Sequence, residues 1–264
     1  MEDLKTTDAV FPAAGATSLS RSLDHGGARE RDFASGSPEV AEWSSYFRRR
    51  ASAGHLFAGI NECLGGGSRK SAVIVGANWL NFSTWLPSFL TLSAAKVADN
   101  LVRHYLIQIA FEELGGRKSD EIHCRLFAEA VAGIGIGEAE LASAAGGAQS
   151  DIYDDFYEAL LRAESTAEVL GLNLGVEIIA EENIETLFAL LAYSDTAAET
   201  LNESVFFRMH RAIEEEHLRL SISNFLRFCG DDEDKRLFLR GFDKSIDFWR
   251  SFWNRNRLII SSAA

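Results

Sequence analysis

The residue types best suited to catalysis lie close together between Phe206 and His217, a segment with two histidines and several acidic residues. No glycine or proline interrupts residues 201–228, so we expect this segment to be helical. At about 100° per residue, His210, Glu214 and His217 fall within an arc of about 60°. Two imidazoles and a carboxylate on one helix face can bind a transition metal. The alternative is a solvent-exposed acidic face with two incidental histidines.

Two glutamates interrupt apolar helix faces, where burying an unpaired carboxylate is costly. Glu113 continues the apolar face of one expected helix, whereas the neighbouring Glu112 points about 100° away. Glu177 continues the apolar face of another, and the small residues Gly171 and Gly175 beside it would let a further helix approach closely. Each buried carboxylate then needs a lysine, an arginine or a metal ion as its partner.

A third histidine, His123, follows a break at Gly115-Gly116 that can turn it back toward Glu113. The resulting set contains three carboxylates and three imidazoles, more than the four ligands that a zinc ion prefers. Mixed oxygen and imidazole ligands suit two iron or manganese ions with open positions. The sequence therefore contains a candidate dinuclear metal site, made of Glu113, His123, Glu177, His210, Glu214 and His217.

The composition indicates a soluble helical protein. Only 3 of the 264 residues are proline, and long periodic stretches rich in Ala, Leu and Glu favour an all-α fold. The formal charge of −13 repels phosphate backbones and anionic membranes, so we expect no nucleic-acid or membrane partner. The sequence has no membrane-spanning apolar run, no secretory signal and no Cys-x-x-Cys pair, and therefore predicts a reducing, cytoplasmic location.

We expect a flexible leader over residues 1–36 and a single helical domain over residues 37–264. Pro87 should kink or divide the helix expected over residues 68–95, and residues 141–149 should form a loop. The remaining helices are expected over residues 37–50, 55–64, 99–114, 119–133, 151–163, 166–180, 182–193, 201–228 and 231–253.

Four motifs follow one another along the chain: Trp85-Leu86-Pro87-Ser88-Phe89; Glu113-Leu114-Gly115-Gly116 with the later His123; Leu170-Gly171 through Glu177; and His210-x-x-x-Glu214-x-x-His217. In this order and spacing they resemble the haem-oxygenase-like diiron oxidases and oxygenases, iron-containing redox enzymes related in fold to thiaminase-like proteins. The resemblance covers about residues 40–255. It implies an all-α, single-domain, haem-oxygenase-like helical bundle.

The resemblance also implies a function. Members of the family are non-haem diiron enzymes that use O2 to oxidise amino-acid, amine or fatty-acid-type substrates by N-oxygenation, oxidative C–C cleavage or desaturation, often in natural-product biosynthesis. For this chain it implies two Fe(II) ions, with manganese as the alternative metal. An external electron donor and a homodimeric assembly are compatible with it.

The resemblance implies that Glu113, His123 and His210 hold one iron and that Glu214 and His217 hold the other. It implies that Glu177 bridges the two irons or lies beside them. The carboxylates that would shift during catalysis are Glu113, Glu177 and Glu214. The family usually has Asp in the middle of the last motif, where this chain has Glu214. We expect this longer side chain to move the second iron or to weaken its binding.

The substrate pocket would be lined by aromatic residues, for which the candidates are Trp79, Trp85, Tyr105, Phe206 and Phe207. The aromatic stripe could equally be core. A carboxylate substrate would need a cation, for which the candidates are Arg103, Lys96 and Arg211, unless these are surface charges.

Two other functional classes stay open. A metal-independent, thiaminase-like hydrolase or transferase of the same fold would use a cysteine nucleophile, and Cys124 is adjacent to His123. Adjacent helical residues point about 100° apart, however, so these two are not a ready nucleophile–base pair. A non-enzymatic helical interaction protein would explain the acidic surface, but not acids and histidines on apolar faces.

Overall fold

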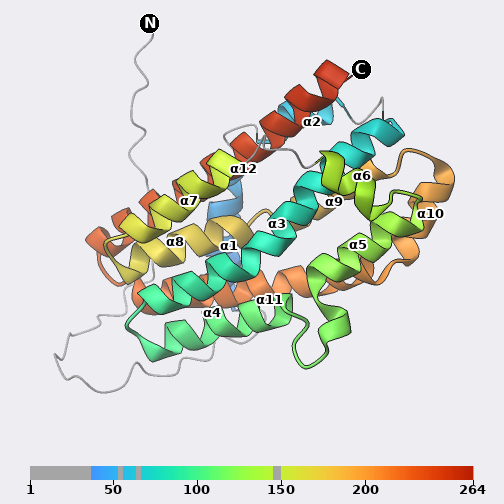
Figure 1. The fold of residues 1–264 in the computed structure, drawn as a ribbon. Coiled ribbons are helices and arrows are strands. Elements are labelled where there is room, and N and C mark those ends of the chain that lie inside the picture. Colours follow the sequence, from blue (N-terminus) through green and yellow to red (C-terminus); the bar gives the residue numbers. More distant parts are fainter. Residues whose placement is uncertain (1–36, 53–55, 64–66, 145–149, 264) are drawn as a thin grey trace, which may run out of the picture.

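The computed structural model describes residues 37–52, 56–63, 67–144 and 150–263, with no β-strand among them, so the all-α prediction is confirmed (Figure 1). None of the described helices is long and apolar enough to cross a membrane. The expected leader, residues 1–36, lies outside the described residues. The helices are α1 (Pro38–Ser52), α2 (Ala58–Asn61), α3 (Arg69–Lys96), α4 (Asn100–Glu113), the 3-10 helix η2 (Ser119–Glu121), α5 (His123–Gly133), α6 (Glu138–Ala144), α7 (Ser150–Arg162), α8 (Thr166–Glu177), α9 (Ala180–Leu191), α10 (Asp195–Glu203), α11 (Val205–Phe228) and α12 (Asp232–Ala263).

The long helices α3, α11 and α12 enclose the shorter α8, with α4 lying alongside α3 and α11 (Figure 1). Every residue of α8 from Ala167 to Glu177 is buried, which explains why its apolar residues are spread around the whole helix. Aromatic side chains fill the space between α3 and α12: the Phe82 ring lies 4.7 Å from that of Trp249, and Trp79 stacks on Trp249 at 6.1 Å. The core therefore surrounds the helix that carries Glu177.

The close approach of α8 and α12 depends on small residues, as the sequence predicted. A Cβ atom on Gly171 would lie 1.9 Å from the Phe238 carbonyl oxygen, and one on Gly175 would lie 2.3 Å from Ser245 Cβ. The Ser245 hydroxyl donates to the Leu172 carbonyl at 2.5 Å. Because the two backbones nearly touch, α8 has little freedom to shift along or rotate against α12.

Two of the expected helix boundaries are wrong. Helix α3 is not divided at Pro87, which is buried inside one continuous helix of 28 residues. Tertiary packing around the proline outweighs the backbone hydrogen bond that it cannot donate. The segment expected to be a loop begins as α6, where the good helix formers Glu and Ala surround the buried Leu141. The rest of that expected loop, residues 145–149, lies outside the described residues.

The helix expected over residues 201–228 is two helices in the structure, α10 and α11. Ser204 separates them with extended backbone angles and caps α11 by accepting a hydrogen bond from the Phe207 amide at 3.4 Å. The last helix extends ten residues beyond the expected end at Trp253, to Ala263. Neither difference moves His210 or His217 off α11.

The Gly171→Ala variant should be destabilised by about 1–3 kcal/mol, because its methyl group would collide with the backbone carbonyl of Phe238 rather than with a movable side chain. Chemical denaturation of the metal-free chain measures the loss. Gly230→Ala is the matched control, since no atom lies within 4 Å of its added Cβ. Equal stability of the two variants would show that α8 and α12 are too far apart for a Gly171 methyl group to reach the Phe238 carbonyl.

Candidate metal centre

Glu113 and His123 are brought together by a tight turn between α4 and α5. Glu113 is the last residue of α4, and His123 is the first of α5. Gly115 and Gly116 have φ angles of +82° and +60°, and a Cβ on Gly115 would lie 2.3 Å from the Lys118 carbonyl oxygen. Only glycine fits the first of these positions. The turn places His123 Nδ1 2.9 Å from Glu113 Oε2, as the sequence predicted.

His210 joins this pair from α11. Its Nδ1 donates to the Phe206 carbonyl at 2.9 Å, one turn earlier in the same helix, and the Phe206 ring lies 4.1 Å from the imidazole. This hydrogen bond assigns the proton of the neutral ring to Nδ1 and leaves the lone pair on Nε2. The His123 and His210 rings lie 4.8 Å apart. One ligand atom from each of Glu113, His123 and His210 lies within 4.8 Å of the others, and all three residues are buried.

The chemistry of these groups fits a cation. His123 Nδ1 is buried beside the Glu113 carboxylate, but its geometry makes no hydrogen bond there. Burial opposes ionisation of Glu113, yet its contact with His123 and the nearby imidazoles hold its pKa below the ordinary value. Burial lowers the pKa of His210 to about 4. At neutral pH the cluster therefore offers an ionised carboxylate and a neutral His210, the protonation states that metal ligands require.

His217, two turns after His210 on α11, is buried beside two carboxylates. Its Nε2 donates to Glu112 Oε2 at 2.8 Å, so Nδ1 carries the lone pair of the neutral ring. That Nδ1 lies 3.7 Å from Glu177 Oε2. Hydrogen bonds of this kind orient metal-binding histidines in other proteins. The arrangement points the lone pair of His217 toward Glu177.

Glu177 is the buried carboxylate whose negative charge is least compensated by its neighbours. Its pKa is raised to about 7, first because burial penalises the charge and second because Glu113 and Glu112 are nearby, although His217 opposes the shift. A cation held between these groups would remove that penalty.

Glu214, the remaining predicted ligand, belongs to α11, but its side chain lies outside the described part of the structure. Sequence reasoning missed the role of Glu112. The sequence predicted only that it points about 100° away from Glu113. Its partner His217 is 105 residues later in the chain, however, and helix periodicity gives no signal for that contact.

Two hollows meet beside Glu177 and His210. An inner cavity of about 40 Å³ is mostly apolar and lies between α3, α4, α8, α9, α11 and α12. An outer cleft of about 470 Å³ is polar and shares Glu177, Ile184 and His210 with the inner cavity. The inner lining is Trp79, Phe82, Ser83, Leu86, Glu113, Val176, Glu177, Ala180, Asn183, Ile184, His210, His217 and Trp249.

Of the aromatic residues predicted to line the substrate pocket, the structure places Trp79 in the lining of the inner cavity. Trp85 is not in this lining; it stacks on Phe89 at 5.0 Å and lies behind Phe82, with ring centres 6.1 Å apart. Phe206 and Phe207 are buried in the core, and Phe206 supports the ring of His210. These three side chains do not line the inner cavity, because they are packed between helices elsewhere in the core.

The cation candidates and Tyr105 have other partners. Arg103 donates to the Val97 carbonyl at 2.5 Å, and Lys96 donates to the Leu161 carbonyl in the last turn of α7. Tyr105 accepts a hydrogen bond from Arg227 at 2.7 Å. Arg211 alone among them lines the outer cleft, where it pairs with a glutamate.

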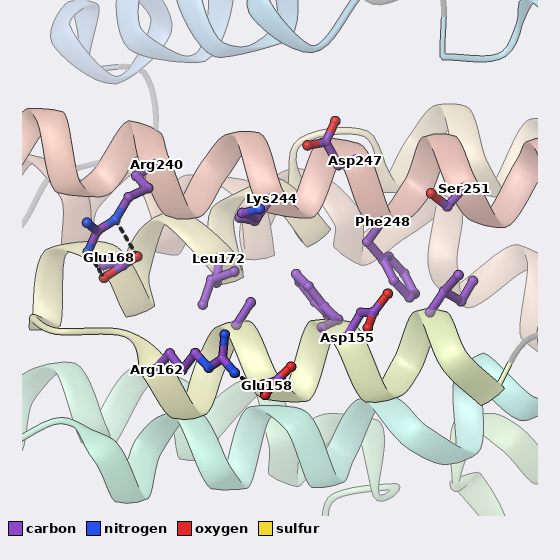
Figure 2. A pocket seen from close by; sticks show the side chains of 13 residues that line it. Asp155, Glu158, Arg162, Glu168, Leu172, Arg240, Lys244, Asp247, Phe248 and Ser251 are labelled. Atoms are coloured by element: carbon purple, nitrogen blue, oxygen red, sulfur yellow. Dashed lines mark hydrogen bonds and ion pairs between the residues drawn. The ribbon is translucent and has the colours of Figure 1, made fainter.

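A further groove of about 430 Å³ lies on the outside of α7, α8 and α12 (Figure 2). Its arginines are already paired with acids within it: Arg240 binds Glu168 at 2.6 Å, and Arg162 binds Glu158 at 2.5 Å. None of the predicted site residues lines it. The two hollows beside the histidines are therefore the better candidates for a reaction site.

Comparisons with solved structures support the fold. Crystal structures, at 2.00 Å and 1.35 Å resolution, of a CADD-like protein of unknown function from Nostoc punctiforme PCC 73102 match the chain with TM-scores of 0.63 and 0.65. The matches cover 82% and 86% of this chain and 97% and 98% of the other, at 19% sequence identity. No curated protein matches the sequence. At this identity the likeness establishes the fold alone.

The sequence itself establishes the family. Residues 80–250, which include every predicted metal ligand, match the family described as "Iron-containing redox enzyme". That match confirms both the resemblance stated from the motifs and the haem-oxygenase-like fold. The buried cluster of carboxylates and imidazoles thus lies within the matched region, and the chain belongs to the iron-containing redox enzyme family.

Proposed function

We propose that the protein is a non-haem diiron oxidase or oxygenase that uses O2 to oxidise a small amino-acid, amine or fatty-acid-type substrate. The observation that carries the proposal is the buried cluster of Glu113, His123 and His210, with His217 and Glu177 beside it. Bound iron would supply the electron-transfer chemistry with O2 that amino-acid side chains lack. N-oxygenation, C–C cleavage and desaturation are all compatible with this site, as is a role in natural-product biosynthesis.

The side chains have separate tasks in this proposal. Glu113, His123 and His210 hold one iron, and the Phe206 carbonyl keeps the His210 ring in place. His217 and Glu214 would hold the second iron, and Glu177 would supply a further carboxylate to the pair. Glu112 orients the His217 ring. All of these residues lie on helices or at helix ends, which favours a preformed site.

The walls of the inner cavity complete the site. Phe82, Leu86 and Trp249 are almost fully buried and form an apolar surface opposite the carboxylates and imidazoles. Such a surface excludes water and keeps the reacting group of the substrate next to the ligands. The outer cleft provides the space for the rest of the substrate.

No observation favours the cysteine-dependent alternative. Cys124 is adjacent to His123 on α5, but it is not among the residues that line either hollow. A Cys124→Ser variant should therefore keep both iron binding and any iron-dependent turnover. A protein that only binds a partner through its surface does not need buried imidazoles and carboxylates, whose burial costs free energy.

Anaerobic titration of the metal-free chain with Fe(II), followed by metal analysis after dialysis, should give close to two irons per chain. His210→Ala and His217→Ala should each retain at most one. His104→Ala is the matched control, because His104 is an exposed histidine outside the cluster, and it should bind as the unmodified chain does. Iron content at background level in the unmodified chain, or equal content in all three variants, would refute the proposal.

Glu112→Ala should weaken iron binding at the site of His217 by about 10- to 100-fold, because the imidazole loses the acceptor that orients it. Glu112→Gln keeps an acceptor without the charge and should lose less. Competition with a chromophoric chelator measures both affinities. Glu158→Ala removes an exposed acid elsewhere and controls for net charge. The prediction fails if Glu112→Ala loses no more affinity than this control.

The raised pKa of Glu177 makes a prediction for the metal-free chain. Because the folded state holds the proton up to about pH 7, this residue contributes stability at low pH that is lost between about pH 4.5 and 7. Glu177→Gln cannot ionise, so at pH 8 the metal-free variant should be more stable than the unmodified chain by about 2–4 kcal/mol, and the difference should vanish near pH 4.5.

Chemical denaturation at the two pH values measures this difference. Glu168→Gln is the matched control. Glu168 is also buried, and burial opposes its ionisation, but its hydrogen bonds with Arg240 and the Glu164 amide and the nearby positive charges together lower its pKa. That variant should lose stability at pH 8. A stability change of the same sign in both variants at pH 8 would contradict the raised pKa of Glu177. Glu177→Gln should also bind iron more weakly, because a neutral amide replaces a carboxylate ligand.

A further inference from the structure

Two tryptophans form part of the wall of the inner cavity, next to the proposed metal ligands. Trp79 and Trp249 line the cavity together with Glu113, Glu177 and His210. Their rings stack on each other, with centroids 6.1 Å apart. Among the described residues of this lining there is no tyrosine, cysteine or methionine. The two indoles are therefore the side chains that a strongly oxidising centre in this cavity would oxidise most readily.

A line of aromatic rings leads from these indoles toward the surface. The Phe82 ring lies 4.7 Å from that of Trp249 and 6.1 Å from that of Trp85. The Trp85 ring in turn lies 5.1 Å from Tyr157, a partly exposed residue of α7, which runs along α12 (Figure 1). Phe82 is not easily oxidised itself, but a single ring is a short distance for an electron to tunnel between the indoles on either side of it.

A second branch of the aromatic cluster ends inside the protein. Trp253 stacks on Trp79 at 6.2 Å and is fully buried. Its further ring contacts are with Phe57 and Phe252, at 6.0 and 5.1 Å. Because a phenyl ring is a poor electron donor, this branch offers no route to an exposed donor. The route through Trp85 does, because it ends at a phenol that is in contact with solvent.

Several polar atoms of this cluster take no part in hydrogen bonding. Four of them are buried, have no partner among the described residues and cannot be reached by a water molecule: the indole nitrogens of Trp79, Trp85 and Trp249, and the Tyr153 hydroxyl. A buried donor without an acceptor costs stability, and phenylalanine would pack in the same core without that cost. Hydrogen bonding therefore does not account for indole and phenol rings at these positions, whereas their ease of oxidation does.

The missing acceptors also decide where an oxidised ring can persist. An indole that loses an electron becomes acidic, but without an acceptor for its N–H proton it stays a radical cation and takes an electron from the next ring. Tyr153, 5.3 Å from Trp85, cannot lose its phenolic proton for the same reason, and burial raises its pKa. Tyr157 is partly exposed and can release its proton to water. Oxidation should therefore end at Tyr157, as a neutral phenoxyl radical.

We propose that Tyr157, Trp85 and the two indoles of the inner cavity form an electron-transfer path that protects the site when no substrate is bound. The cavity indoles give one electron to iron that O2 has oxidised. Trp85 then reduces the indoles, and Tyr157 reduces Trp85 while its phenolic proton passes to water. A thiol or ascorbate in solution returns one electron, and the phenol regains a proton from water. The inference rests on the proposed function, which supplies the oxidant.

The last step of the path can be tested in the metal-free chain. Pulse radiolysis with azide radicals oxidises accessible indoles, and Trp85 is the one of the five tryptophans that is partly exposed. Transient absorption should show its radical converting to a tyrosyl radical at a rate independent of protein concentration. Tyr157→Phe should abolish this conversion. Tyr153→Phe is the matched control and should leave it unchanged, because Tyr153 is nearly as close to Trp85 but cannot lose its proton.

The whole path is tested in the full chain loaded with Fe(II) and mixed with O2 in the absence of substrate. Freeze-quench electron paramagnetic resonance should show a tyrosyl radical, identified by the narrowing of its signal when the chain contains ring-deuterated tyrosine. Tyr157→Phe and Trp85→Phe should bind iron normally but lack this signal. Peptide mass spectrometry of these two variants should find oxygen added to Trp79 or Trp249 instead. Tyr153→Phe should give the signal of the unmodified chain.

Three results would overturn the inference: an unchanged radical conversion in Tyr157→Phe, a tyrosyl signal that persists in Trp85→Phe, or consumption of O2 by the iron-loaded chain with neither a tyrosyl signal nor oxidised tryptophan. Failure of the proposed function gives a different pattern. In that case the chain takes up no iron and consumes no O2, and the protective role falls with it, while Trp85 still passes its radical to Tyr157 in the metal-free chain.

Discussion

The site depends on ionisable side chains being buried inside a helical core. An isolated carboxylate or imidazolium in such a core is strongly unfavourable, so each must be neutral or close to an opposite charge. The structure meets this condition locally. His210 is neutral and bonded to a backbone carbonyl, Glu113 lies against His123, and His217 bonds to Glu112. The charge of Glu177 is the least compensated of these, and a cation bound between Glu177 and His217 would remove the penalty of burying it.

Two close backbone contacts hold these groups in place. The turn at Gly115 returns the chain so that the end of α4 meets the start of α5. The contact of Gly171 and Gly175 with α12 sets the position of α8, and with it the position of Glu177. Both contacts involve backbone atoms that cannot rotate away. A site supported in this way can keep its geometry when ligands exchange or a substrate enters the cavity.

Much of the fold was predictable because helix formation is largely local. Amphipathic periodicity, serine caps and glycine stops located most helices, and the apolar faces that end in Glu113 and Glu177 correctly predicted buried carboxylates. The errors arose where packing overrides local preference. Pro87 is tolerated within α3 because the surrounding core holds the helix together, and Ser204 starts a new helix where the sequence has neither glycine nor proline.

The sequence by itself determined which residue types share a helix face and which family the chain belongs to. Only the tertiary structure decided which of them meet. The bond of Glu112 to His217 and the convergence of Trp79, Asn183 and Trp249 join residues far apart in the chain. Helix periodicity specifies the direction of a side chain relative to its own helix axis. Its partners depend on how the helices pack against one another, and that packing results from the whole set of buried contacts.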